Sequence, residues 1–195
     1  LDEEPDIASP ADALREVPDG SVRFEGVGFK YRADAKKNVL EGIDLDRVYV
    51  NGASQGGGLG IGTCALNADL VSRAAILYPF LSDFRLVWDL DADDIAYEGL
   101  RYWSRWFDED TSRIEEAYSK LAYFDSKNFA PRVRCDVLFG TGTADIVCPP
   151  PTQFAVYNNL NCPKRHEFFE GFGHEEIQAF DDMIIPFFCG EANHE

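Results

Sequence analysis

The sequence predicts an α/β protein with a mostly parallel sheet and flanking helices. From Arg47 onward, short apolar runs alternate with longer segments of helical spacing, and three of those runs end at glycine or proline. The chain has 195 residues, of which 45% are hydrophobic and 13% aromatic, so it can enclose one sizeable core. We therefore expect one main domain.

The first 45 residues have a different character. Residues 1–20 are acidic and contain three prolines, which is typical of a linker. Apolar residues then alternate over 22–31 and resume over 39–45, a pattern that predicts a β-hairpin. The predicted organisation is a linker and hairpin over residues 1–45, an α/β domain over 46–190 and a tail over 191–195.

The elements of the α/β segment follow from short-range patterns. Strands are predicted at Val48 to Val50, Ala74 to Tyr78, Val137 to Phe139 and His166 to Phe169. Helices are predicted around Leu59 to Leu66 and over 93–107, 112–124, 151–160 and 175–188. Asp110 or Thr111 is the expected N-cap of the helix over 112–124. Trp103 and Trp106 are expected in the core, with a sugar-facing rim as the alternative for one of them.

Charge and cysteine usage exclude several classes of protein. The formal net charge of −17, from 35 acidic and 18 basic residues, has the wrong sign for neutralising phosphates. Nucleic acid and membrane surfaces are therefore not expected as partners. No apolar run approaches the ~18 residues that a bilayer-spanning helix needs, so a soluble protein is expected. The five cysteines lack C-x-x-C spacing, which favours a reducing, cytoplasmic location.

The sequence shows no set of residues typical of a metal or cofactor site. Asp91, Asp93 and Asp94 form a short acidic run, but no glycine and distal glutamate complete the spacing of a calcium loop. We expect a solvated acidic loop there, and neither metal nor cofactor.

Gly52-Ala53-Ser54-Gln55-Gly56 matches the G-x-S-x-G pattern between a predicted strand and a predicted helix. This context predicts a sharp turn that exposes the Ser54 hydroxyl, with glycines two positions either side because side chains there would collide. The backbone N–H of Gln55, at the helix N-terminus, can donate to an oxyanion. Ser54 is thus a candidate nucleophile, and a plain glycine turn is the alternative.

A nucleotide-binding loop is a competing interpretation, since Gly52 and Gly57 have the G-x-x-x-x-G spacing. Gly58 and Leu59 stand where a lysine and a serine or threonine would contact the phosphates and Mg²⁺. ATP binding is therefore not expected at this loop.

A serine nucleophile needs a base, and the chain has three histidines. His194 lies in the tail, and His166 lies within an alternating strand, where a structural role is favoured. His174 follows Gly171-Phe172-Gly173 between the last strand and the last helix, where a loop can bring it over Ser54. His174 is the predicted general base.

Asp145 follows the strand over 137–142, at the edge where α/β sheets present functional groups. It is the candidate orienting acid, and an Asx-turn or a cap is the alternative. The order Ser54, Asp145, His174 is the chain order of α/β-hydrolases.

From about Asp44 to Gly190 the chain resembles carbohydrate esterase family seven, the acetyl xylan esterases and cephalosporin-C deacetylases. The resemblance rests on Gly52 to Gly58, Tyr78-Pro79-Phe80-Leu81-Ser82-Asp83-Phe84, Tyr123-Phe124-Asp125, Asp145-Ile146-Val147-Cys148-Pro149-Pro150 and Gly173-His174-Glu175. It implies a partial α/β-hydrolase fold, the C-terminal half of the sheet, with Ser54, Asp145 and His174 as the triad. It also implies small acetylated carbohydrates or cephalosporins as substrates and a cytoplasmic homo-oligomer.

Residues 1–45 resemble instead the opening of an ABC-exporter nucleotide-binding domain, through Glu3-Glu4-Pro5-Asp6 and the segments 22–31 and 39–45. An aromatic residue matching Tyr31 stacks on adenine there, but the phosphate-binding lysine and signature sequence are absent. Tyr31 is therefore expected to be a hairpin residue. The chain is interpreted as a composite, joined near Ile43 to Arg47, without the esterase family's N-terminal half and its second oxyanion donor.

The expected function is hydrolysis of acetyl esters through an acyl-enzyme on Ser54. Two alternatives stay open. One is an inactive or structural composite with an incomplete oxyanion hole, and the other is an ATP-binding fragment of a transporter.

Overall fold

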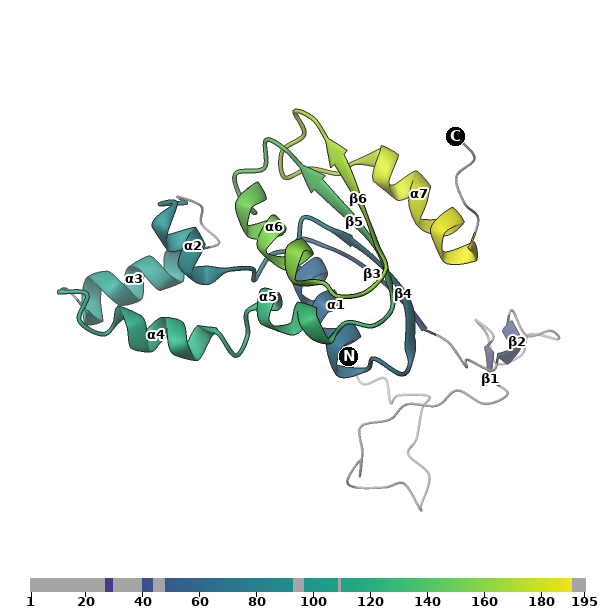
Figure 1. Cartoon of the computed structure of the whole chain (residues 1–195), viewed down its shortest axis with the longest axis horizontal. Helices are drawn as coiled ribbons and strands as arrows, with labels where there is room; N and C mark the ends of the chain where they lie inside the picture. Colours follow the sequence, from purple (N-terminus) through teal and green to yellow (C-terminus); the bar gives the residue numbers. More distant parts are fainter. Residues whose placement is uncertain (1–26, 30–39, 44–47, 93–96, 109, 191–195) are drawn as a thin grey trace, which may run out of the picture. The chain divides into compact units, whose positions relative to one another are not determined.

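The structure, a computed structural model, describes residues 27–29, 40–43, 48–92, 97–108 and 110–190. Contacts between Cα atoms divide the chain into two units, Leu1–Asp46 and Arg47–Glu195. In the first unit, β1 (Val27–Phe29) and β2 (Leu40–Ile43) pair antiparallel (Figure 1). These strands lie within the two arms predicted for a hairpin. The expected linker over 1–20, Tyr31 and the tail over 191–195 lie outside the described residues.

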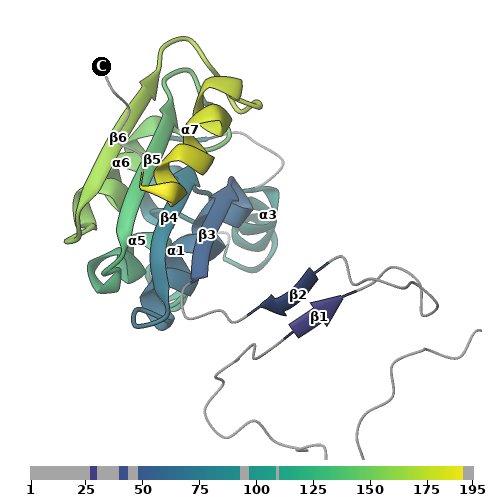
Figure 2. The ribbon, with the colours of Figure 1, turned by 90° about the vertical axis from the view of Figure 1, so that its right-hand side faces the viewer.

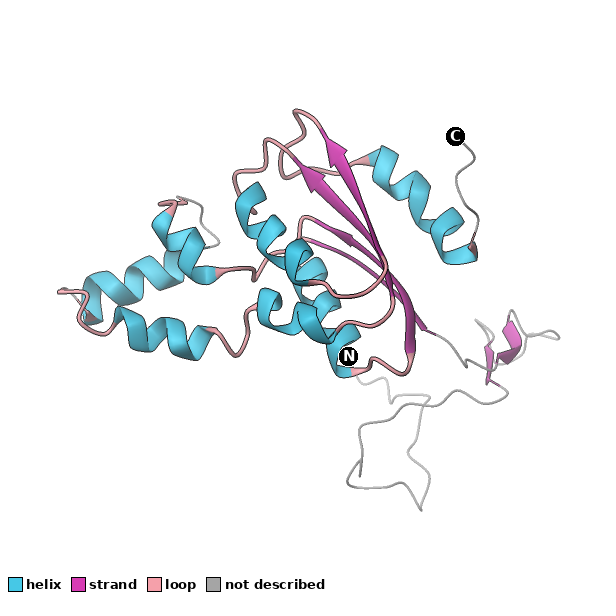
Figure 3. Ribbon diagram, viewed as in Figure 1, coloured by secondary structure: helices cyan, strands magenta, loops and turns pink. Residues whose placement is uncertain are grey.

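The second unit alternates strands with helices. Its strands are β3 (Val48–Ala53), β4 (Val71–Leu77), β5 (Asp136–Gly142) and β6 (Lys164–Phe169). Its helices are α1 (Gln55–Leu66), α2 (Phe84–Asp89), α3 (Glu98–Phe107), α4 (Ile114–Leu121), α5 (Ser126–Phe129), the 3-10 helix η2 (Ala130–Arg132), α6 (Pro150–Asn159) and α7 (Gln178–Cys189). The four strands pair in parallel in the order β3-β4-β5-β6, and Figure 3 shows them as magenta arrows among cyan helices. This confirms the predicted fold class.

Helices cover both faces of this sheet, α1 and α6 on one side and α7 on the other (Figure 2). The alternation of side chains along β4 explains the two layers. Ala74 and Ile76 are fully buried in the cluster that faces α1 and α6, whereas Ala75 and Leu77 belong to the cluster that faces α7. A sheet buried on both faces gives a rigid support to the loops that leave its strand ends.

Arg73 on β4 fixes the end of α7. Its guanidinium donates hydrogen bonds to the carbonyl oxygens of Phe187 (3.0 Å) and Phe188 (2.6 Å), in the last turn of the helix. The Phe187 carbonyl also accepts the N–H of Gly190 (3.2 Å), and a cation is favourable at a helix C-terminus. Gly190 then ends the helix with a φ of 80°. The position of α7, and of the loop before it, is thereby tied to the central sheet.

The segment α2 to α4 lies beside the sheet, to the left in Figure 1. The predicted N-cap of α4 is wrong. The chain turns at Thr111, whose φ is 58°, and the carboxylate of Asp108 reaches forward to accept the backbone N–H of Arg113 (2.9 Å) at the helix start. Trp106 is 62% exposed, so its expected place in the core is also wrong. Within helix α3 only Ser104 is buried.

Among the described residues, no helix is both long enough and apolar enough to cross a membrane.

Candidate active site

Ser54 occupies the turn between β3 and α1. Its backbone has φ 54° and ψ −122°, a conformation that residues other than glycine rarely adopt. Its N–H donates to the Leu77 carbonyl (3.1 Å), and its own carbonyl accepts from the N–H groups of Phe80 (2.8 Å) and Gly58 (3.1 Å). These bonds hold the strained turn, which places the hydroxyl at the end of the sheet.

The glycines around Ser54 contribute differently from what the sequence predicted. A Cβ at Gly52 would lie 2.2 Å from the Gly56 carbonyl oxygen, so the expected collision occurs there. A Cβ at Gly56 would meet nothing within 4 Å, so the same expectation is wrong for Gly56. The crowded position in α1 is Gly58, where a Cβ would lie 2.1 Å from the Phe80 carbonyl oxygen. Position 58 therefore has no room for the lysine of a phosphate-binding loop.

Asp145 lies in the turn after β5, and its carboxylate is almost completely buried. Oδ1 accepts the backbone N–H groups of Val147 (2.9 Å) and Cys148 (2.8 Å), which is an Asx-type turn. Oδ2 lies 3.0 Å from Nδ1 of His174. Asp145 therefore closes a turn through Oδ1 and contacts His174 through Oδ2, so the two interpretations of this residue do not exclude each other.

His174 lies in the loop between β6 and α7 and bridges the other two residues. Its Nδ1 is 3.0 Å from Asp145 Oδ2, and its Nε2 is 2.8 Å from the hydroxyl oxygen of Ser54. A neutral imidazole with its proton on Nδ1 donates to the carboxylate and accepts from the hydroxyl. The structure therefore brings the three residues singled out in the sequence into one hydrogen-bonded chain.

Tyr78, at the end of β4, supports His174 and was not singled out from the sequence. Its ring centroid lies 4.7 Å from that of the imidazole, and its hydroxyl donates to the carbonyl oxygen of Glu175 (2.8 Å). Burial, and secondarily the negative charge of Asp145, raise the pKa of Tyr78, so it stays a neutral donor. Only its position as the last residue before Pro79 could have suggested this contact.

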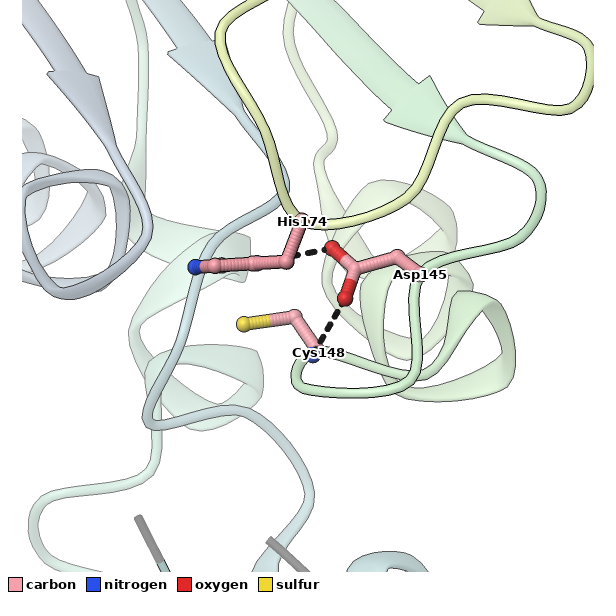
Figure 4. Close-up of side chains that lie close together, drawn as sticks. All are labelled: Asp145, Cys148 and His174. Atoms are coloured by element: carbon pink, nitrogen blue, oxygen red, sulfur yellow. Dashed lines mark hydrogen bonds and ion pairs between the residues drawn. The ribbon is translucent and has the colours of Figure 1, made fainter. Parts of the chain in front are cut away.

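Two further residues surround Asp145. Gln153, fully buried on α6, donates from Nε2 to the Cys148 carbonyl (2.5 Å) and approaches Asp145 Oδ2 at 3.5 Å. Cys148 is buried, and Figure 4 shows its backbone nitrogen bonded to the same carboxylate. Helical spacing predicts that Gln153 faces the sheet, but nothing in the sequence indicates that it reaches Asp145.

Gln55 is the first residue of α1, so its backbone N–H has no intrahelical acceptor. This leaves the N–H beside Ser54 available at the positive end of the helix dipole. The arrangement is that of an anion-stabilising donor next to a serine hydroxyl.

The remaining sequence candidates lie elsewhere. His166 is on β6, where its Nε2 is 2.8 Å from Thr141 Oγ1, and His194 is outside the described residues. Asp91 pairs with Arg101 (2.8 Å), while Asp93 and Asp94 are not described. The structure thus does not bring His166 or Asp91 to Ser54.

A cavity of about 500 Å³ lies between the residues that follow β4 and helices α3 and α4. Phe80 and Tyr97 form its inner wall, with ring centroids 5.3 Å apart. The Tyr97 hydroxyl donates to the Val147 carbonyl (2.7 Å), two residues after Asp145. Trp103 lines the outer part of the cavity, so it does not lie in the sheet core.

A parallel sheet with helices on both faces, and a Gly-x-Ser-x-Gly turn that leads from a strand into a helix, define an α/β-hydrolase-fold protein. Within this class the chain belongs to the acetyl xylan esterase family, because the family's sequence model, acetyl xylan esterase (AXE1), matches residues 31–191. This confirms the resemblance of the segment from Asp44 to Gly190.

Individual relatives agree with this assignment. The acetyl esterase Axe7A of Xylanibacter ruminicola is 35% identical over 121 residues, which are 62% of this chain and 26% of that protein. The crystal structure of acetyl xylan esterase 1 from Thermoanaerobacterium sp. is 41% identical, with a TM-score of 0.74, over 80% of this chain and 49% of that chain. The acetyl xylan esterase from Paenibacillus sp. R4 is 33% identical, with a TM-score of 0.73, over 77% of this chain and 47% of that chain.

The chain spans about half the length of these solved relatives and about a quarter of the curated one. The family match begins at residue 31 and so overlaps the segment that resembles an ABC-exporter domain. These matches do not test that resemblance, the composite interpretation or the cytoplasmic location, and all three stay predictions.

Proposed function

We propose that the chain is a serine esterase that hydrolyses small acetyl esters of carbohydrates. The observation that carries the proposal is the hydrogen-bonded chain from Ser54 Oγ through His174 to Asp145, with contacts of 2.8 and 3.0 Å. A nucleophile, a base and an orienting acid in this order are the parts that acyl transfer requires. Membership of the acetyl xylan esterase family supports the substrate class.

In the first half of the reaction, Ser54 Oγ attacks the acetyl carbonyl carbon while His174 Nε2 takes the hydroxyl proton. The carbonyl oxygen becomes an oxyanion, to which the Gln55 N–H donates. The intermediate then breaks its bond to the sugar oxygen, which takes the proton from His174. The sugar leaves with a free hydroxyl, and the acetyl group stays on Ser54.

In the second half, water replaces the sugar. His174 takes a proton from the water as its oxygen attacks the acetyl carbonyl carbon, and the same N–H of Gln55 receives the second oxyanion. Breaking the bond to Ser54 Oγ returns the proton to the serine and releases acetate. Asp145 keeps the His174 proton on Nδ1 before each attack and stabilises the imidazolium that each attack forms.

The choice between acetylated sugars and other acetyl esters is a narrower part of the proposal. The resembled family also deacetylates cephalosporins, so cephalosporin C is a second substrate to test beside acetylated xylo-oligosaccharides. The family resemblance also implies a homo-oligomer, which we propose for this chain. Light scattering of the purified chain tests this oligomeric state.

The central experiment measures hydrolysis of p-nitrophenyl acetate by the purified chain and by its Ser54→Ala variant. We expect kcat/KM to fall by about 10⁴-fold or more, since loss of a serine nucleophile removes the covalent route. Ser119→Ala is the matched control, because Ser119 lies on the exposed side of α4 and bonds only its own helix at Glu115. Equal turnover by the chain and by Ser54→Ala would contradict the proposal and favour an inactive composite.

A further inference from the structure

Three side chains of the kinds that bind transition metals meet at the candidate active site, and two of them belong to its hydrogen-bonded chain. Atoms of Asp145, Cys148 and His174 that can act as ligands all lie within 4.8 Å of one another (Figure 4). Two ligand atoms on one tetrahedral Zn²⁺ lie roughly 3 to 4 Å apart. A small side-chain movement therefore brings all three atoms into one coordination sphere.

Two of the three ligands are already held together. Asp145 and Cys148 belong to one tight turn, closed by the bond from the Cys148 N–H to Asp145 Oδ1 (2.8 Å). Both are buried, at 3% and 1% exposure, whereas the His174 side chain is 23% exposed. An ion can therefore approach past the imidazole and meet a preformed pair of oxygen and sulfur donors.

The donor set selects a class of cation. Sulfur, imidazole nitrogen and carboxylate oxygen together suit Zn²⁺ and Co²⁺, whereas Mg²⁺ and Ca²⁺ prefer oxygen ligands alone. Three protein ligands leave a fourth position for water.

We propose that Asp145, Cys148 and His174 form an inhibitory site for a divalent cation of the zinc class, in competition with the Ser54–His174 hydrogen bond. The inhibition rests on the proposed esterase function, whereas the binding site does not.

The metal ion and the Ser54–His174 hydrogen bond compete because they need the His174 proton on different ring nitrogens. A metal ion on Nδ1 of His174 requires that nitrogen to be unprotonated, so the neutral ring carries its proton on Nε2. Nε2 then cannot accept the hydroxyl proton of Ser54. Cys148 binds as the thiolate and releases one proton to water. The metal therefore removes both the base and the orienting contact with Asp145 at once.

Binding is tested first, without any turnover. Co²⁺ is added to the full-length chain, and thiolate-to-cobalt charge-transfer absorption is recorded together with the visible d–d bands. We expect a charge-transfer band that saturates near one equivalent. Cys148→Ser should lose the band and bind about a hundredfold more weakly, because loss even of an outer-shell partner weakens metal binding by 10- to 100-fold.

Other thiols provide the controls. Cys189→Ser should keep the band, since Cys189 is exposed at the end of α7. Cys135→Ser should also keep it, because Cys135 lies in the core cluster on the other face of the sheet. No band in the unsubstituted chain, or a band that survives both Cys148→Ser and Cys148→Ala, would overturn the proposal.

Inhibition is measured second, as the ratio of p-nitrophenyl acetate turnover with Zn²⁺ to turnover with a chelator. We expect at least a tenfold loss in the unsubstituted chain and a shift of about a hundredfold in the inhibiting Zn²⁺ concentration in Cys148→Ser. Unchanged turnover with the site saturated would overturn the competition. A cobalt band without any turnover that depends on Ser54 would instead contradict the proposed function and leave the metal site standing.

Discussion

Strand β6 and the loop that follows it each hold a histidine, in very different surroundings. His166 on β6 packs between Tyr157 and Phe168, with ring centroids 4.2 and 4.1 Å away, and its Nε2 contacts the Thr141 hydroxyl. His174 in the loop has a carboxylate on one nitrogen and a serine hydroxyl on the other. The same side chain is a packing element in one region and a candidate base in the other.

The difference lies in what each region offers the charged imidazolium. Burial lowers the pKa of His166 to about 4, with the nearby charge of Lys164 acting in the same direction and that of Glu167 opposing it. The charge of Glu167 favours the imidazolium there, but it does not outweigh the effect of burial. Beside His174, the carboxylate of Asp145 faces the ring directly. A strand end is thus suited to a base because polar groups from neighbouring strands converge there, which the middle of a strand does not allow.

The largest expected effect separates the two histidines. His174→Gln removes the proposed base, so hydrolysis of p-nitrophenyl acetate should fall by about 10⁴-fold or more in kcat/KM. His166→Gln keeps a partner for the Thr141 hydroxyl and should change kcat/KM by less than about threefold, since a packing change far from the reacting atoms leaves the catalytic geometry intact. Comparable losses of kcat/KM in both variants would contradict the assignment of His174 as the base and His166 as a packing residue.

The next effect concerns the acid behind His174. Asp145→Asn keeps the shape of the side chain but presents an amide to Nδ1, which favours the wrong tautomer of the imidazole. In serine proteases this change lowers kcat by about 10⁴-fold, and we expect a fall of about 10³- to 10⁴-fold here. The measurement is kcat for p-nitrophenyl acetate across the pH range, with Asp182→Asn, an exposed change on α7, as the control. A loss below about tenfold would exclude Asp145 as the orienting acid.

Sequence patterns predicted the parallel sheet because three of its four strands, β3, β4 and β5, contain short β-branched or apolar runs with glycine or proline at or just after their ends. The same patterns placed Ser54, Asp145 and His174 at strand ends, and the family resemblance selected them together. Tyr78 and Gln153 could not be found in this way. Their contacts form only when β4 and α6 pack beside the loops that follow β5 and β6. The motif that begins at Tyr78 indicates the family but not this contact, and Gln153 lies in no motif.

Two predictions from short sequence patterns were wrong: the N-cap of α4 and the crowding at Gly56. The chain turns at Thr111 and α4 begins only at Ile114, where Asp108 accepts the N–H of Arg113, the residue before the helix. Crowding at the turn of Ser54 falls on Gly58 rather than Gly56, because α1 packs closely against the residues after β4. At Gly58 a contact between distant segments thus overrides a short-range rule, whereas at α4 the difference arises within the loop before the helix.

A smaller effect tests whether the carboxylate of Asp145 depends on its buried neighbour. Gln153→Met keeps the volume of the side chain but removes the amide that approaches Oδ2 and holds the Cys148 carbonyl. Hydrogen bonds to charged groups contribute about 1.5–3 kcal/mol, and this contact is long, so we expect about a tenfold fall in kcat/KM. Gln178→Met, on the exposed side of α7, is the matched control. Equal kcat/KM in the two variants would show that Asp145 is held by its backbone contacts alone.

The smallest expected effect is on stability and concerns His166. Its pKa of about 4 in the folded chain lies below the ordinary value of about 6.5, so the unfolded chain binds the proton more readily between these pH values. Its contribution to the free energy of unfolding is therefore fully present above about pH 6.5 and is lost as the pH falls towards 4. Because the ring is only half-buried, we expect a loss of about 1 to 2 kcal/mol rather than the full value that the pKa difference implies.

Urea unfolding at about pH 7.5 and about pH 4.5, in the unsubstituted chain and in His166→Gln, measures this loss. Acidic side chains titrate in the same range, but they do so in both proteins, so the difference between the two pH-dependent losses isolates His166. The unsubstituted chain should lose more stability than the variant on acidification. An equal loss would mean that the aromatic neighbours of His166 do not destabilise its imidazolium. The surroundings of His166 and His174 would then differ in geometry but not in their effect on a charged imidazole.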